Sequence, residues 1–136
     1  MKLMLQFSRL SCLLLALTCV ATLGCGSELP STVSGKVTFG GAPLTKGTVT
    51  FAPQGEGRIA YGEIDSSGNY TVRTLNDQGM QLGEYNVTII ATGEAPASDV
   101  PPPLITPAKY ANAKTSGFTA SIKPGPNTFD FALEKE

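Results

Sequence analysis

Strict alternation of apolar and polar residues constrains this chain more than any other feature. Six runs place an apolar side chain at every second position with mostly polar residues between them: 33–39, 48–51, 70–73, 85–91, 118–123 and 128–134. A seventh, less regular run covers residues 58–64. Successive side chains of a strand point to opposite faces, so this pattern predicts strands with one buried face. No segment after Cys25 has apolar residues at helical spacing, and the sequence therefore predicts an all-β domain.

Turn-forming residues separate these runs. Segments 40–43, 53–57 and 124–127 are rich in glycine and proline, which favour reversals of the chain. Seven short strands with one apolar face each predict two sheets packed face to face over residues 33–136.

One segment, residues 92–116, breaks the rhythm with five prolines and little alternation. Pro101, Pro102 and Pro103 are consecutive and should hold an extended polyproline conformation. A loop this long inside a domain is uncommon and is either functional or a covering flap. Two interpretations stay open: the prolines block a sheet edge from pairing, or the segment is a binding surface.

The first 24 residues have the composition of a secretory signal. Lys2 and Arg9 precede an apolar run over residues 10–20, which is shorter than the roughly twenty residues that span a bilayer. Residues 22–25, Thr-Leu-Gly-Cys, resemble the lipobox of bacterial lipoproteins, in which the cysteine is diacylated and becomes the first mature residue. The alternative is ordinary cleavage near Gly24, which would leave a free thiol.

Lipidation of Cys25 predicts a membrane anchor, because each buried methylene of an acyl chain contributes about 0.8 kcal/mol. Residues 25–32 would then form a lipidated tether. The residue after the cysteine is Gly26. In enterobacterial lipoproteins, an aspartate at that position retains the protein in the inner membrane. By that resemblance we expect an exported protein at the outer membrane or cell surface.

The composition excludes several classes of function. Without the signal the chain keeps eight bases against eleven acids, a formal net charge of −3, and no basic cluster. Nucleic acid is disfavoured as a partner because phosphate binding needs clustered cations. The absence of histidine excludes a Ser-His-Asp triad and a histidine-built zinc site. We expect no cofactor and no catalytic residues.

The densest group of oxygen ligands lies in "EIDSSGNYTV" at residues 63–72. A calcium loop of the EF-hand type that begins at Asp65 would need a bidentate Glu as its twelfth residue, where Asn76 stands. A turn explains more: Asp65 accepts backbone N–H groups, Gly68 or Asn69 takes a positive φ, and Tyr70 restarts the inward face. Weak calcium binding is the alternative.

Three further constellations have simpler explanations. Ser66 and Ser67 lack a base to activate a hydroxyl. Glu63 and Glu84 are a candidate carboxylate pair for glycoside hydrolysis, although two solvated acids at strand ends explain them better. In the proline-rich segment, Lys109 and Tyr110 are a candidate partner contact, with a tyrosine that fastens the loop to the body as the alternative.

Three stretches resemble the carboxypeptidase regulatory-like domain, which has a seven-stranded transthyretin-like (prealbumin-like) sandwich: "SGKVTFGGAPLTKGTVTFAP" at 34–53, "GEIDSSGNYTV" at 62–72 and "LGEYNVTI" at 82–89. The matching residues are Gly35, Val37, Pro43, Leu44, Val49, Phe51, Asp65, Gly68, Tyr70, Gly83 and Tyr85. The whole chain also resembles short planctomycete-type lipoproteins that carry this one domain.

The resemblance implies a fold more than a function. Two enzyme families share a transthyretin-like fold, the hydroxyisourate hydrolases and the intradiol dioxygenases, and both use histidines that this chain lacks. The sequence therefore predicts a non-catalytic, membrane-anchored module that binds an envelope protein or glycan or serves a structural role. The alternative function is an accessory subunit of a separate envelope hydrolase, such as a peptidase.

Overall fold

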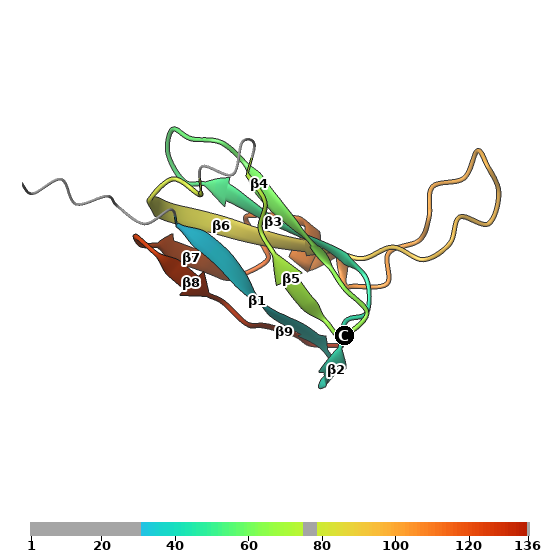
Figure 1. Ribbon diagram of the computed structural model, residues 1–136. Coiled ribbons are helices and arrows are strands. Elements are labelled where there is room, and N and C mark those ends of the chain that lie inside the picture. The colour runs from blue at the N-terminus through green and yellow to red at the C-terminus, as the bar shows by residue number, and fades with distance from the viewer. Residues whose placement is uncertain (1–30, 75–78, 136) are drawn as a thin grey trace, which may run out of the picture.

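Nine strands and one short 3-10 helix make up the computed structural model, which describes residues 31–74 and 79–135 (Figure 1). The strands are β1 (Thr32–Phe39), β2 (Ala42–Pro43), β3 (Gly47–Pro53), β4 (Ala60–Ile64), β5 (Asn69–Thr71), β6 (Gly83–Ile90), β7 (Phe118–Ile122), β8 (Pro126–Thr128) and β9 (Phe131–Leu133), and η2 is Ala108–Ala111. No α-helix occurs among the described residues, so the prediction of an all-β chain is confirmed.

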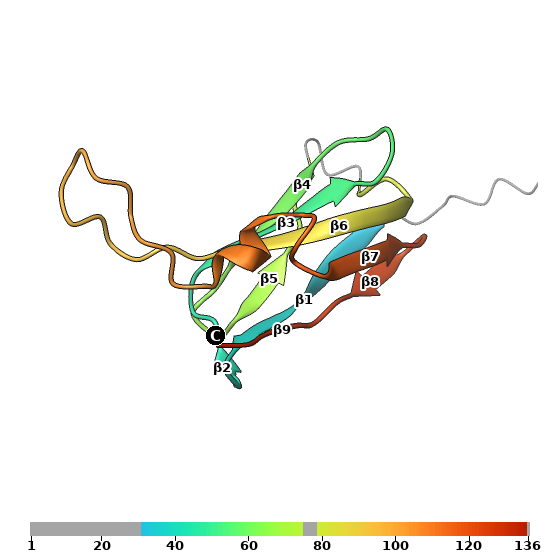
Figure 2. The same cartoon turned by 180° about the vertical axis from the view of Figure 1, so that it is seen from behind.

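Hydrogen bonds join the strands into one curled sheet in the order β2-β1-β5-β4-β3-β6-β7. These neighbours are antiparallel, whereas β8 and β9 both pair with β1 in parallel, one after the other along its length. The curl brings β7, at one end of the path, beside β8, which pairs with β1, whereas β2 at the other end lies apart (Figures 1 and 2). The strand path therefore forms a half-barrel.

The core fills the inside of this curl, as the alternation predicts. Val33, Val37, Val49, Phe51 and the other inward residues of each strand are buried, and the residues between them face outward. Phe51 is fully buried, with its ring centroid 6.2–6.4 Å from those of Tyr70, Tyr85, Phe129 and Phe131. Aromatic pairs at such spacings add about 0.5–1.5 kcal/mol each beyond their buried area.

The number of strands differs from the seven predicted, for two local reasons. Gly40 and Gly41 have φ values of 58° and 85° and form a two-residue hairpin turn, which folds Ala42 and Pro43 back on β1 as β2. The predicted run 128–134 is split into β8 and β9, because Asp130 accepts the Lys36 N–H through its side-chain Oδ1, at 2.8 Å, in place of a ladder carbonyl.

The predicted turn at residues 124–127 is a turn only in its first half, because its second half belongs to strand β8. Gly125 makes the reversal with a φ of 86°, but Pro126 and Asn127 already pair with β1 as the start of β8. The Asn127 side chain holds the reversal closed: its Nδ2 donates to the Lys123 and Gly125 carbonyls, and its Oδ1 accepts the Lys123 N–H.

The proline-rich segment 92–116 divides into two parts with different roles. Residues 92–104, here named the arm, project from the body in Figures 1 and 2. Its stem is a ribbon closed by hydrogen bonds from the Gly93 N–H to the Pro103 carbonyl and from the Ile105 N–H to the Ala91 carbonyl, both 2.8 Å. Beyond that stem, residues 94–102 are exposed, so Pro101 and Pro102 do not cover a sheet edge.

Residues 106–116, here named the cover, protect the part of β6 that β7 does not reach. The Ala91 N–H donates to Thr106 Oγ1, and Ser116 Oγ donates to the Val87 carbonyl at 2.6 Å. Tyr110 stacks on Phe118 with a centroid distance of 5.4 Å. Edge protection thus comes from polar side chains and one aromatic ring.

The predicted signal peptide, Cys25 and most of the predicted tether lie outside the described residues. Within residues 31–74 and 79–135, no helix has the length and apolar character needed to cross a membrane.

Candidate functional site

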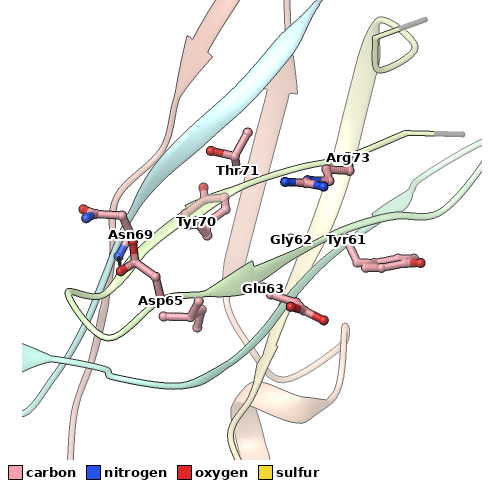
Figure 3. A pocket seen from close by; sticks show the side chains of 9 residues that line it. Tyr61, Gly62, Glu63, Asp65, Asn69, Tyr70, Thr71 and Arg73 are labelled. Carbon is pink, nitrogen blue, oxygen red and sulfur yellow. Dashed lines mark hydrogen bonds between the residues drawn. The ribbon is translucent and has the colours of Figure 1, made fainter. Parts of the chain in front are cut away.

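An open hollow of about 520 Å³ lies on the outer face of β4 and β5 (Figure 3). Its polar lining comes from six side chains: Tyr61, Glu63, Asp65, Asn69, Thr71 and Arg73. We name it the β4–β5 hollow. Its lining brings together an aromatic ring, charges of both signs and a hydroxyl.

Strand register places the first half of this lining. Ala60, Gly62 and Ile64 are the inward residues of β4, so Tyr61 and Glu63 must point outward. The neighbouring strand β3 pairs Thr50 with Tyr61 and Thr48 with Glu63. Both acid and ring therefore stand on a face otherwise covered by threonine, which leaves them exposed.

A glycine brings the second half of the lining close. A Cβ added at Gly62 would lie 2.7 Å from the Thr71 carbonyl oxygen, a distance that side chains do not tolerate. The missing side chain lets the backbone of residues 71–73 approach β4, and the Arg73 N–H donates to the Tyr61 carbonyl at 3.1 Å. Thr71 and Arg73 are thereby placed beside Glu63 and Tyr61 (Figure 3).

The turn between β4 and β5 closes one end of the hollow. Asp65 Oδ1 accepts the N–H groups of Ser67 at 2.8 Å and Asn69 at 2.9 Å. The backbone N–H of Asn69, followed by that of Ser67, lowers the pKa of the Asp65 carboxyl below its usual 3.8. Gly68 has a φ of 84° and contributes its carbonyl to the Val37 N–H, which ties the turn to β1. Asp65 therefore lies at the rim, Gly68 fixes the turn behind it, and Tyr70 is buried beneath.

The side chains above this rim are free to meet a ligand. Tyr61 is 59% exposed, whereas Tyr70, Tyr85 and Tyr110 are 5% exposed or less. In the described part of the chain, the side chains of Tyr61, Glu63 and Arg73 make no hydrogen bond or ion pair with another residue. The hollow can therefore accept hydrogen bonds, donate them and stack on a flat apolar surface.

The described residues contain no cluster of side chains suited to binding a metal ion. Among residues 31–74 and 79–135, no group of three or more His, Cys, Asp or Glu side chains is arranged to hold a metal ion. In the turn, one oxygen of Asp65 is already committed to two backbone N–H groups.

The structure does not bring together the carboxylate pair Glu63 and Glu84. Glu63 is opposite Thr48 at one end of β3, whereas the Glu84 carbonyl accepts the N–H of Gln54 beyond the other end. Six residues of strand separate these positions, about 20 Å at 3.3 Å per residue. Retaining and inverting glycosidases need about 5–10 Å, so this candidate pair is wrong.

Lys109 and Tyr110 are placed on η2, at the cover. Tyr110 is 5% exposed, stacks on Phe118, and its hydroxyl accepts the Glu134 N–H at 3.0 Å. Lys109 lies with its Nζ 5.0 Å from the centre of the Tyr110 ring. The ring that was a candidate partner contact is thus packed inside the protein, where it fastens the cover to the body.

Tyr61 and Arg73 are the functional candidates that sequence reasoning missed. The run 58–64 is irregular because Gly62 replaces an apolar residue at an inward position. Once Ala60 and Ile64 are taken as inward residues, Tyr61 must lie on the outer face. An exposed aromatic ring was therefore predictable at this position. No sequence pattern pointed to Arg73, because only the close approach of the backbone at Gly62 brings it to Tyr61.

The fold and the hollow define this chain as an all-β domain with a polar, aromatic-bearing outer sheet face. No protein-family model matches it, and no curated protein matches it either. Among solved structures it is similar to the dioxygenase domain of a dioxygenase carbohydrate-binding protein fusion from the cellulolytic bacterium Streptomyces sp. SirexAA-E. The two chains share 22% sequence identity with a TM-score of 0.36, over 80% of this chain and 83% of the other.

Proposed function

We propose that this chain is a non-catalytic binding module of the bacterial envelope, anchored to a membrane by lipid on Cys25. The observation that carries the binding role is the β4–β5 hollow, where the exposed side chains of Tyr61, Glu63 and Arg73 have no hydrogen bond or ion pair to any other described residue. Sites built on strands hold their side chains in more exact positions than sites on mobile loops.

The family proposal concerns the fold in finer detail. We infer a carboxypeptidase regulatory-like domain with a transthyretin-like, two-sheet sandwich, in which β1 belongs to both layers. The long β1 supports this inference, because it pairs with β5 and β8 through its first half and with β2 and β9 through its second. The short planctomycete-type lipoproteins are the group it would join.

The anchor is supported by the lipobox-like residues 22–25 and by where the body begins. Strand β1 starts at the end of the body opposite the arm (Figures 1 and 2). A lipid on Cys25, seven residues before Thr32, would hold that end toward an outer membrane or the cell surface. The arm would then point away from the lipid.

Lipidation is tested by Cys25→Ser, with Cys19→Ser and Cys12→Ser as matched controls in the same chain. We expect Cys25→Ser alone to abolish incorporation of labelled fatty acid and to move the protein into the soluble fraction. Membrane partition that Cys25→Ser leaves unchanged contradicts the anchor.

A second function, that of an accessory subunit of a separate envelope hydrolase, is favoured by the arm. Val100 and Leu104 are 44% and 47% exposed there, and polyproline segments lose little conformational freedom on binding. Its test is copurification from solubilised membranes with residues 94–102 replaced by two glycines. A stoichiometric peptidase that is lost with the shortened arm, and retained with Ser121→Ala, supports this function over the first.

A further inference from the structure

The ring of Tyr61 is the only exposed tyrosine ring of the chain, since all four tyrosines lie in the described residues. A single exposed apolar group is ordinary on a protein surface and by itself indicates nothing. Its meaning comes from its neighbours, because Glu63, Thr71 and Arg73 surround it with an acceptor, a hydroxyl and a planar donor.

Strand position argues against a peptide in this hollow. An extended peptide binds a sheet by adding a strand to its edge, where backbone N–H and C=O groups are unpaired. Strand β4 is paired with β3 and β5, and β5 with β1 and β4, so neither is an edge. Recognition here must come from side chains alone.

Charge argues against an anionic ligand. Glu63 and Asp65 contribute two negative charges and Arg73 one positive charge, so the hollow has a net charge of −1. Phosphates and polyuronates gain no net attraction from that balance, and Lys46 nearby only brings it to zero, whereas a neutral ligand meets both donors and acceptors without desolvating a charge of its own.

We propose that the β4–β5 hollow binds a neutral β-linked oligosaccharide of gluco configuration; this inference rests on the binding role proposed above. Equatorial hydroxyls leave the faces of such a sugar ring covered by axial C–H groups, which fit the electron-rich face of Tyr61. The hydroxyls at the ring edge then reach Glu63 and Arg73. Planar carboxylate and guanidinium groups match neighbouring hydroxyls in pairs.

The sheet face offers room for more than one sugar. A second hollow of about 400 Å³ is lined by Lys46, Thr48 and Ile90, and Glu63 also lines it. Glu63 therefore stands between two adjoining hollows, with Tyr61 on one side and Lys46 on the other. A tetrasaccharide can contact both, so it binds more tightly than a disaccharide of the same linkage.

The test uses the native full-length lipoprotein in a detergent without a sugar headgroup. Cellotetraose and tetra-N-acetylchitotetraose are the probes, cellobiose tests length, maltotetraose tests linkage, and tetragalacturonate tests charge. The chain has no tryptophan, so tyrosine fluorescence and calorimetry report binding together. Nitration of Tyr61, mapped by peptide mass, gives a site-specific readout, because this ring alone is exposed and bound sugar protects it.

We expect a dissociation constant of about 0.1–1 mM for at least one β-linked probe, as suits a shallow site. Tyr61→Ala should weaken it by about tenfold, and Tyr61→Phe, which keeps the ring, by less than about threefold. Leu82→Ala removes an exposed apolar side chain outside the hollow and should change nothing.

Three results overturn the inference: no binding of either β-linked probe at about 10 mM, binding that Tyr61→Ala leaves intact, or tighter binding of tetragalacturonate than of cellotetraose. Each of them leaves the proposed lipid anchor standing, because Cys25→Ser tests the anchor independently of the hollow. A protein that is not anchored through Cys25 but still binds sugar would contradict the anchor and leave the sugar site standing.

Discussion

Replacing Gly35 with alanine should be among the most destabilising single-methyl changes in this protein. A Cβ at Gly35 would lie 1.8 Å from the carbonyl oxygen of Phe129, whereas an ordinary van der Waals contact of a Cβ is 3.4–4 Å. That carbonyl is fixed in place, because it accepts the Tyr70 hydroxyl at 2.7 Å while the Phe129 N–H donates to Ser34 at 3.0 Å. The chain between β8 and β9 thus crosses directly over Gly35.

The magnitude follows from what has to move. Overpacking costs about 1–3 kcal/mol, and the displaced carbonyl loses its bond from Tyr70, which costs about another 1–3 kcal/mol at a part-buried site. Alanine recovers about 0.4–1 kcal/mol by restricting the unfolded chain. The net loss for Gly35→Ala is about 3 kcal/mol, which lowers the melting temperature by roughly 12–24 °C in a domain of this size.

Urea unfolding followed by circular dichroism measures this loss, with Gly55→Ala as the matched control. Nothing lies within 4 Å of a Cβ at Gly55, so that change should stay within about 0.5 kcal/mol of wild type. Tyr70→Phe removes the same hydrogen bond alone, so the double variant should cost less than the sum of the two. A Gly35→Ala protein within about 0.5 kcal/mol of wild type refutes the account.

Three further predictions concern single side chains. Burial raises the pKa of the Tyr70 phenol well above 10.0. The stability that the neutral, buried phenol contributes is therefore complete below pH 10 and is lost as the pH rises further. Urea unfolding from pH 8 to 11 should show a smaller loss of unfolding free energy with rising pH in Tyr70→Phe than in wild type. The lowered pKa of Asp65 gives stability above 3.8 that disappears as the pH falls through the folded value; thermal melts below pH 4 should show no such step in Asp65→Asn, which keeps a side-chain acceptor. Tyr110→Ala should cost about 3 kcal/mol and Tyr110→Phe about 1 kcal/mol by urea unfolding, because only the first removes the ring stacked on Phe118; equal costs contradict the packing role.

The antiparallel strands were predictable because their pattern is local. Alternation at residues 33–39 and 85–91 names the inward face without reference to any other segment, and Val33, Val37, Val87 and Ile89 are all fully buried. Burial of one face is enough to set the phase of a strand, since its side chains repeat every two residues.

The breaks in that pattern were not predictable, because they depend on contacts far apart in the sequence. Strand β9 is separated from β8 by a hydrogen bond from Lys36 to Asp130, across 94 residues. The hollow depends in the same way on Gly62, whose lack of a side chain matters only because Thr71 crosses it. A glycine in an irregular run gives no sign of which strand approaches it.

The two surfaces left open by the fold differ in the recognition that they permit. On β4 and β5 the backbone is committed to ladders, so a ligand meets only the outward side chains Tyr61, Glu63 and Arg73. On the arm, residues 94–102 lie beyond the last ribbon hydrogen bond; apart from the turn closed by the Val100 N–H and the Ala97 carbonyl, their exposed backbone groups and apolar side chains are available to a partner. Recognition by side chains on a paired sheet face suits a sugar, and an exposed, proline-rich segment that projects from the body suits a protein groove. Loss of sugar binding in Tyr61→Ala and loss of a protein partner with the shortened arm should therefore be independent of each other, since the replaced residues 94–102 line neither of the two hollows.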